Sequence, residues 1–241
     1  TLLDDPNSDR PECRTAIVTR ELSRYNINIA VLRKTRRADE GHLREEGGGY
    51  TFFWKGKPAN NRMTEFPAGI NKRLMTLRLQ LANNSSATVI SAYAPPLAAE
   101  EEQKEQFYAY LDEILTIIPK EDKIILLGDF NARVGWDSNL WRGTIGKEGV
   151  GKANPNGILL LSKCVEHDLV ITNTIFRQHD RYKTTWQHPH SKQWHLLNYV
   201  IVRACDLKDV HITHVMRGAD NCWTDHRLMR SILSIRVALR H

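Results

Sequence analysis

In the stretch LLGDFNARVGWD, residues 126–137, an apolar run ends at a glycine and polar side chains follow. Asp129, Asn131 and Arg133 then occupy every second position. In an extended chain, side chains two residues apart lie on the same side. A carboxylate, an amide and a cation that point together from the end of a buried strand suit a phosphate and an attacking water. The same residue types are common in turns, and this stretch alone leaves that alternative open.

The composition is that of a globular protein with one large core. The 241 residues carry 41% hydrophobic and 26% charged side chains, which are ordinary values. No internal repeat or flexible linker divides the chain, so we expect a single domain over residues 1–241. The formal net charge of +6 favours polyanionic partners. We therefore expect DNA binding that is weak, electrostatic and largely independent of sequence.

The four cysteines contain no CxxC pair, which is typical of reduced thiols inside the cell. The apolar runs are too short to span a bilayer, and the first residues are too polar for a signal peptide. We expect a monomeric intracellular protein, in the nucleus, with no membrane contact.

Hydrophobic periodicity predicts many strands and a few long helices. Val18, Leu22 and Tyr25 recur at the spacing of one helix face. Strands are predicted at residues 27–32, 50–54, 74–81, 87–94, 124–127, 169–173, 184–187, 196–203 and 209–216, and further helices at 98–118 and 157–167, the latter capped by Asn156. Their order, partly β–α–β, favours a layered α/β sandwich.

Four more motifs carry polar side chains in four settings: at the end of a strand, between apolar neighbours, as an adjacent Asp-His pair, and just after a buried strand. They are SAYAP with Tyr93, WHLLNYVIVR with Asn198, DNCWTDHRL with Asp225 and His226, and VLRKTR with Lys34. Each motif alone is unremarkable. An Asp-His pair in a loop, for example, is usually structural.

Together with GDFNAR, and in their order along the chain, these motifs resemble the endonuclease/exonuclease/phosphatase superfamily. They are most similar to the endonuclease domain of RTE-type (Bov-B-like) retrotransposons, through almost the whole chain. The resemblance implies a DNase I-like, four-layer α/β sandwich with two central mixed β-sheets and a site at one end of both. It also implies Mg²⁺ as a cofactor that helps bind the scissile phosphate, while water attacks phosphorus in line.

The resemblance further implies a role for each matching residue. Asp129 would orient or deprotonate the attacking water, and Asn131 and Tyr93 would hold phosphate oxygens. His226 would stabilise the charge that develops on phosphorus, and Asp225 would lie near the metal. These roles agree with the chemistry of phosphoryl transfer, which depends on positioning and charge neutralisation.

The chain departs from this family at two site positions. Lys34 stands where the family has a Glu that binds Mg²⁺, and an ammonium cannot be a metal ligand. Asn198 stands where the family has an Asp that holds the catalytic histidine. The chain also begins without the family's first strand and has no match to another strand within residues 55–73. We therefore expect an N-terminally truncated domain with weakened or lost activity.

Two functions remain open at this point, because the retrotransposon-like C-terminal half argues against a third, a phosphatase of the same superfamily that acts on a small phosphoester. One is an AP-endonuclease-like domain of retrotransposon origin, Mg²⁺-dependent by ancestry and impaired by Lys34 and Asn198. The other is a non-catalytic domain that keeps the nuclease fold and binds nucleic acid or protein. Arg133 and Trp223 are the candidates for contact with DNA. The histidines of HPHSKQWH, residues 188–195, lack a Cys or carboxylate at ligand spacing, so no zinc site is predicted.

Overall fold

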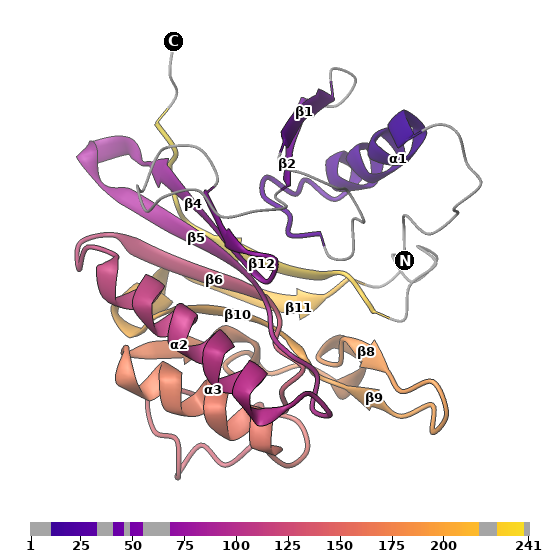
Figure 1. Cartoon of the computed structure of the whole chain (residues 1–241), viewed down its shortest axis with the longest axis vertical. Helices are drawn as coiled ribbons and strands as arrows, with labels where there is room; N and C mark the ends of the chain where they lie inside the picture. Colours follow the sequence, from indigo (N-terminus) through magenta and orange to yellow (C-terminus); the bar gives the residue numbers. More distant parts are fainter. Residues whose placement is uncertain (1–10, 33–40, 46–48, 55–67, 217–225, 239–241) are drawn as a thin grey trace.

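A mixed β-sheet forms the centre of the computed structural model, which describes residues 11–32, 41–45, 49–54, 68–216 and 226–238 (Figure 1). Its strand order is β3-β4-β5-β6-β10-β7. β5 and β6 run parallel, whereas the other neighbouring pairs are antiparallel. The strands are β3 Ala68–Asn71, β4 Leu74–Gln80, β5 Ser86–Tyr93, β6 Lys123–Asp129, β7 Leu169–Ile171 and β10 Asn198–Arg203.

β6 is apolar without alternation because both faces of the sheet are covered. Ile124, Ile125 and Leu126 are all buried, and such a continuous run is typical of a strand between two layers. Two helices, α2 (Glu101–Ile117) and α3 (Pro155–Glu166), cover one face (Figure 1).

The larger core lies between these helices and the sheet. Phe107 and Leu111 of α2, and Leu160 and Leu161 of α3, pack there with the fully buried Tyr199. Burial of each such side chain contributes about 1.5–3 kcal/mol.

The N-terminus of α3 corrects the predicted cap. The helix begins at Pro155, and the Asn154 side chain accepts a hydrogen bond from the Gly157 N–H at 2.8 Å. Proline is favoured at the first helical position because its missing N–H would have no partner there. Asn156 therefore lies inside the helix, where its amide instead donates to the carbonyls of Pro95 and Asn131.

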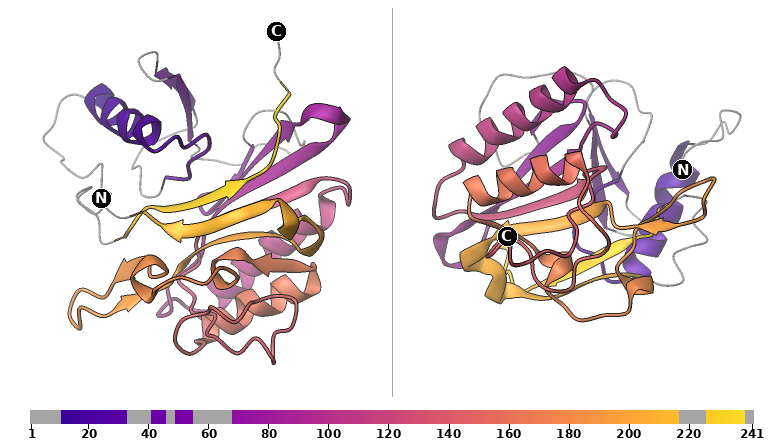
Figure 2. Two further views of the ribbon diagram at one scale, coloured as in Figure 1. Left: turned by 180° about the vertical axis from the view of Figure 1, so that it is seen from behind. Right: turned by 90° about the horizontal axis from the view of Figure 1, so that it is seen from below.

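The other face of the sheet packs against a second, two-stranded sheet, β11 (Val210–Val215) and β12 (Met229–Leu233). Val89, Ile125 and Val200 are buried here, with Met229 and Leu233 of β12 partly buried against them. Helix α1 (Pro11–Arg24) and the pair β1 (Gly41–Glu45) and β2 (Tyr50–Trp54) lie on the side of the molecule away from α2 and α3 (Figures 1 and 2).

A short hairpin, β8 (Trp186–Gln187) and β9 (Trp194–His195), projects from one end of the sheet (Figures 1 and 2). The remaining elements are 3₁₀ turns, η1 Ala82–Asn84, η2 Thr172–Thr174, η3 Asp180–Tyr182 and η4 Ala204–Asp209. Within the described ranges, no helix has the length and apolar character needed to cross a membrane.

The predicted α/β class is confirmed, with a central mixed sheet between layers. The predicted strand at residues 27–32 is wrong, because no strand is formed there. Ile29 of that segment nevertheless packs against the core between the two sheets, which explains its apolar pattern. β3 forms within residues 55–73, the range in which the sequence showed no match to a further strand of the family. Residues 55–67 lie outside the described part of the chain.

Candidate functional site

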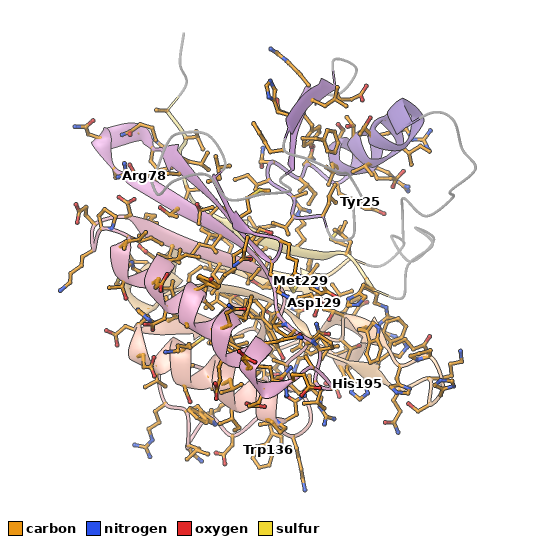
Figure 3. The ribbon with its side chains drawn as sticks, viewed as in Figure 1. Tyr25, Arg78, Asp129, Trp136, His195 and Met229 are labelled. Atoms are coloured by element: carbon orange, nitrogen blue, oxygen red, sulfur yellow. The ribbon has the colours of Figure 1, made fainter. Side chains whose placement is uncertain are left out.

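Three adjacent strands end side by side at the centre of the sheet. Tyr93 of β5 pairs with Asp129 of β6, and Asp129 pairs with Asn198 of β10. Paired residues on neighbouring strands point to the same face. That face is the one towards β11 and β12, because Val89, Ile125 and Val200, which lie an even number of positions from the site residues on the same strands, are buried against β12. Asp129 and Met229 are labelled in Figure 3. The alignment of the strand ends therefore gathers a phenol, a carboxylate and a carboxamide.

Gly128 allows β5 and β6 to approach closely just before the site. Its φ is 153°, and a Cβ at this position would lie 1.8 Å from the Ala92 carbonyl oxygen. A backbone atom cannot retreat as a flexible side chain can. Only glycine therefore preserves the spacing between the strand ends that carry Tyr93 and Asp129.

The chain turns immediately after Asp129, which corrects part of the prediction for residues 126–137. The Asp129 side chain is buried, and its Oδ1 accepts the Asn131 N–H at 3.0 Å. Asn131 has a φ of 47°, so the backbone is not extended there. Burial still alternates, because Phe130 and Ala132 are fully buried whereas Asn131 and Arg133 are partly exposed.

Asn131 is fixed by both its backbone and its side chain. Its Nδ2 donates to the Ala94 carbonyl at 2.9 Å, and its carbonyl accepts from Asn156 at 3.1 Å. An amide nitrogen carries two protons, so one N–H remains for a further acceptor.

His226 lies between Asn198 and Asp129. Its Nδ1 is 3.0 Å from Asn198 Oδ1, and its Nε2 is 3.9 Å from Asp129 Oδ2. The carboxamide oxygen can only accept, so we assign the Nδ1 proton to this hydrogen bond. In the neutral imidazole, Nε2 then presents its lone pair towards Asp129 and the space beside it.

The base of the β8–β9 hairpin holds His226 and Asn198 in place. Trp186 forms an isolated antiparallel bridge with His226. The buried Thr185 hydroxyl accepts the Asn198 N–H at 3.1 Å, and the Thr185 carbonyl accepts the Arg227 N–H at 2.7 Å. The Arg227 guanidinium lies 3.4 Å from the centre of the Trp194 ring, a cation–π contact that ties the hairpin to the residue after His226.

The candidate DNA contacts are only partly described. Arg133 lies just past the site, and its N–H donates to Asn154 at 2.9 Å. Burial lowers the pKa of His195, and the positive charge of Arg133 lowers it further. Trp223, Asp225 and Lys34 lie outside the described residues.

Sequence reasoning missed several residues that support the site. Asn173 bonds to two backbone groups on the same edge of β10, and Thr185 bonds to the start of the same strand. The Arg73 guanidinium lies 5.3 Å from the centre of the Tyr93 ring and 3.3 Å from the Tyr93 carbonyl oxygen. Most of these bonds go to backbone atoms, which leave no pattern in a sequence. Only the position of Arg73, in the turn before β4, could have suggested proximity to Tyr93.

The described donor set does not fit Mg²⁺. Among the described residues at this site, Asp129 is the only carboxylate, and its Oδ1 already accepts a backbone N–H. The Asn198 oxygen accepts from His226. Mg²⁺ requires near-octahedral oxygen coordination, normally with at least one or two free carboxylate oxygens.

One other group within the described ranges brings metal-ligand residues together, on the outer surface of α2 and α3. Asp112, Glu166 and His167 converge there, but the Lys163 ammonium lies 3.0 Å from Asp112 and 2.6 Å from Glu166. Lys163 and His167 also lower the pKa of Asp112, with the hydrogen bond from His167 as the larger cause. The lysine already neutralises these acids, so this is an ion-pair cluster.

Comparison with known proteins gives a clear sequence relationship. The chain is 31% identical over 237 residues to craniofacial development protein 2 from Bos taurus, and equally to that from Tragulus javanicus. Each alignment covers 93% of this chain. No protein-family model matches the chain.

Among solved structures, the 3'-5' exonuclease NExo from Neisseria meningitidis matches with a TM-score of 0.49 at 17% identity. The endonuclease domain of TRAS1, a telomere-specific non-LTR retrotransposon, has the same score at 16% identity. Both matches cover 68% of this chain and 65% of the other.

The alignments cover 39% and 40% of the two curated relatives, so this chain spans about two fifths of their length. The chain is therefore similar, over almost all of its length, to one segment of craniofacial development protein 2.

Proposed function

We propose that the chain is a retrotransposon-derived, AP-endonuclease-like domain whose site was built to hydrolyse DNA phosphodiesters and is now impaired. The observation that carries the proposal is the line Asn198–His226–Asp129 at the end of three strands. A buried acceptor beside an imidazole and two amides suits the transfer of a phosphoryl group to water.

The residues can divide the reaction as follows. Asp129 is the buried acceptor that orients an attacking water or takes its proton. The second N–H of Asn131 and the Tyr93 hydroxyl are donors for the phosphate oxygens. His226 donates from Nε2 when it is protonated, which neutralises negative charge as it develops on phosphorus.

Asn198 weakens this arrangement, because a neutral oxygen stabilises an imidazolium less than a carboxylate does. In a serine protease the same Asp-to-Asn change lowers turnover by about 10⁴-fold. Lys34 adds a second loss, since Mg²⁺ supplies Lewis-acid chemistry in such sites when it is bound. We propose that both substitutions together reduce hydrolysis below the level of a working nuclease.

A plasmid-nicking assay with Mg²⁺ tests the proposal. The wild-type chain is compared with Lys34→Glu, Asn198→Asp and the double variant, with His226→Ala in the double background as the control. We expect little nicking by the wild type, a gain of at least about 10³-fold in the double variant, and none in the control.

The outcomes separate the two functions. If the wild type nicks DNA as fast as the double variant, the proposed impairment is wrong. If no variant nicks but all bind a DNA duplex, the non-catalytic binding domain replaces the nuclease. Arg227 stacked on Trp194 at the hairpin base favours such a binding surface. If no variant nicks or binds DNA, the nuclease and the DNA-binding domain are both excluded, and only the protein-binding form of the second function is left.

A further inference from the structure

Asn173 lies directly after β7, in the turn η2, and is almost fully buried. Its Oδ1 accepts the Val200 N–H at 2.9 Å, and its Nδ2 donates to the Asn198 carbonyl at 3.2 Å. The same Nδ2 lies 2.8 Å from Met229 Sδ. One side chain therefore bonds to two backbone positions of β10 and also contacts the first residue of β12.

These bonds replace a missing piece of the sheet. β7 pairs with β10 from Leu169↔Arg203 to Ile171↔Ile201, and the pairing ends there. Beyond Ile201, the edge of β10 would present an unpaired donor and acceptor inside the protein, which is costly. The Asn173 carboxamide offers one acceptor and one donor, as a backbone peptide would, and so continues the ladder up to Asn198.

The location matters because Asn198 orients His226. Thr185 holds the Asn198 N–H from one direction, and Asn173 holds its carbonyl from another. With both backbone groups fixed, the Asn198 side chain is directed at His226 Nδ1. Loss of the bond from Asn173 frees the backbone next to the side chain that sets the imidazole.

A purely structural role is the alternative, and the neighbouring Thr172 shows what that role looks like. The buried Thr172 hydroxyl donates to the Val200 carbonyl at 2.8 Å and lies 2.8 Å from the Thr213 hydroxyl. Thr213 in turn bonds to Ser231 of β12. Thr172 thus joins β10 to the second sheet without touching Asn198 or His226.

We propose that Asn173 is a positioning residue, which sets the orientation of Asn198 and through it of His226. The proposal rests on the function proposed above for its catalytic consequence, but its structural content does not. A misplacement of about 1 Å at a reacting group can reduce turnover by about 10²-fold. Asn173 therefore has a measurable effect on the site that Thr172 lacks.

The experiment compares Asn173→Ala, Asn173→Asp and the matched control Thr172→Val. Urea unfolding measures stability, and NMR of ¹³C-labelled histidine follows the His226 ring resonances, assigned with His226→Gln. We expect all three variants to lower the unfolding midpoint. We expect both Asn173 variants, but not Thr172→Val, to move the His226 resonances. Asn173→Asp keeps the acceptor for Val200 and replaces the donor with a carboxylate oxygen, so it remains informative if Asn173→Ala does not fold.

Nicking by the Lys34→Glu, Asn198→Asp background adds the catalytic readout. There we expect Asn173→Asp to lower kcat by about tenfold or more with KM unchanged. Unmoved His226 resonances in both Asn173 variants, or an equal movement in Thr172→Val, would overturn the proposal. If the resonances move as expected and no background nicks DNA, the positioning role stands and the proposed function fails.

Discussion

One buried hydroxyl contacts the segment after β6 at two positions, and its removal gives a direct test of how the site is supported. The Tyr199 hydroxyl lies 3.0 Å from the Ala132 carbonyl oxygen and 2.9 Å from that of Leu196, and it accepts the Val134 N–H at 3.3 Å. Tyr199 is fully buried, and burial raises the pKa of its phenol, so the hydroxyl stays protonated. Tyr199→Phe removes the oxygen and changes the shape of the ring very little.

The loss of unfolding free energy can be worked out from the backbone groups that the substitution leaves without a partner. Val134 is 2% exposed and Ala132 is 0% exposed, so water cannot reach their backbone groups without opening the fold. A buried donor or acceptor that loses its partner costs about 1–3 kcal/mol. We expect Tyr199→Phe to lower the free energy of unfolding by about 2 kcal/mol. For a chain of this size, that loss corresponds to a decrease in Tm of about 4–8 °C.

Urea unfolding of Tyr199→Phe beside Tyr110→Phe provides the measurement. Tyr110 lies on α2 with 37% of its surface exposed, so its substitution should change stability by less than about 0.5 kcal/mol. Hydrogen exchange at the Val134 amide should become faster only in the Tyr199 variant. If the two variants are equally stable, the hydroxyl does not hold the segment, and the reasoning about its three partners is wrong.

Three further predictions concern Gly128, two partly buried histidines and the salt dependence of DNA binding. Gly128→Ala should cost about 3 kcal/mol or more in urea unfolding, because its Cβ would meet a backbone oxygen at 1.8 Å; wild-type stability would refute this. Burial lowers the pKa of His195 and His214 below their ordinary value of 6.5. As the pH falls, these histidines therefore bind protons in the unfolded chain before they do so in the folded one. Stability should be complete above about pH 6.5 and fall below it, and His214→Gln should reduce this dependence, as urea midpoints at pH 7.5 and 5.5 will show. DNA affinity should decrease at least about tenfold between 50 and 200 mM salt in fluorescence anisotropy, and a flat response would exclude electrostatic binding.

The sequence was sufficient to predict the centre of the fold. β4, β5, α2 and β6 carry strong hydrophobic patterns, and each forms where the pattern indicates. The segment at residues 27–32 has the same apolar character but packs without forming a strand. Periodicity reports which side chains are buried, and burial does not require that a strand pair with a neighbour.

The residues of the candidate site also fall into two groups, those that the sequence could place and those that it could not. Tyr93, Asp129 and Asn198 could be placed from the sequence because each borders an apolar run, and those runs become neighbouring strands. The supporting residues Asn173 and Thr185 could not, since they act on backbone atoms brought close only by the fold. The sequence leaves the bend at Asn131 open, because an alternating pattern of burial fits both an extended chain and a turn.

The parallel pairing of β5 and β6 has a consequence for how the chain assembles. The two strands are joined by α2, since a parallel pair needs a crossover, and all three elements leave the ribosome before β10. Tyr93 and Asp129 can therefore become neighbours while Asn198 and His226 are still being synthesised. During that interval, the edge of β6 that β10 later covers is open to other strands. A translational pause before residue 198 would prolong this exposure, so this is the stage at which a chaperone would be most useful to the nascent chain.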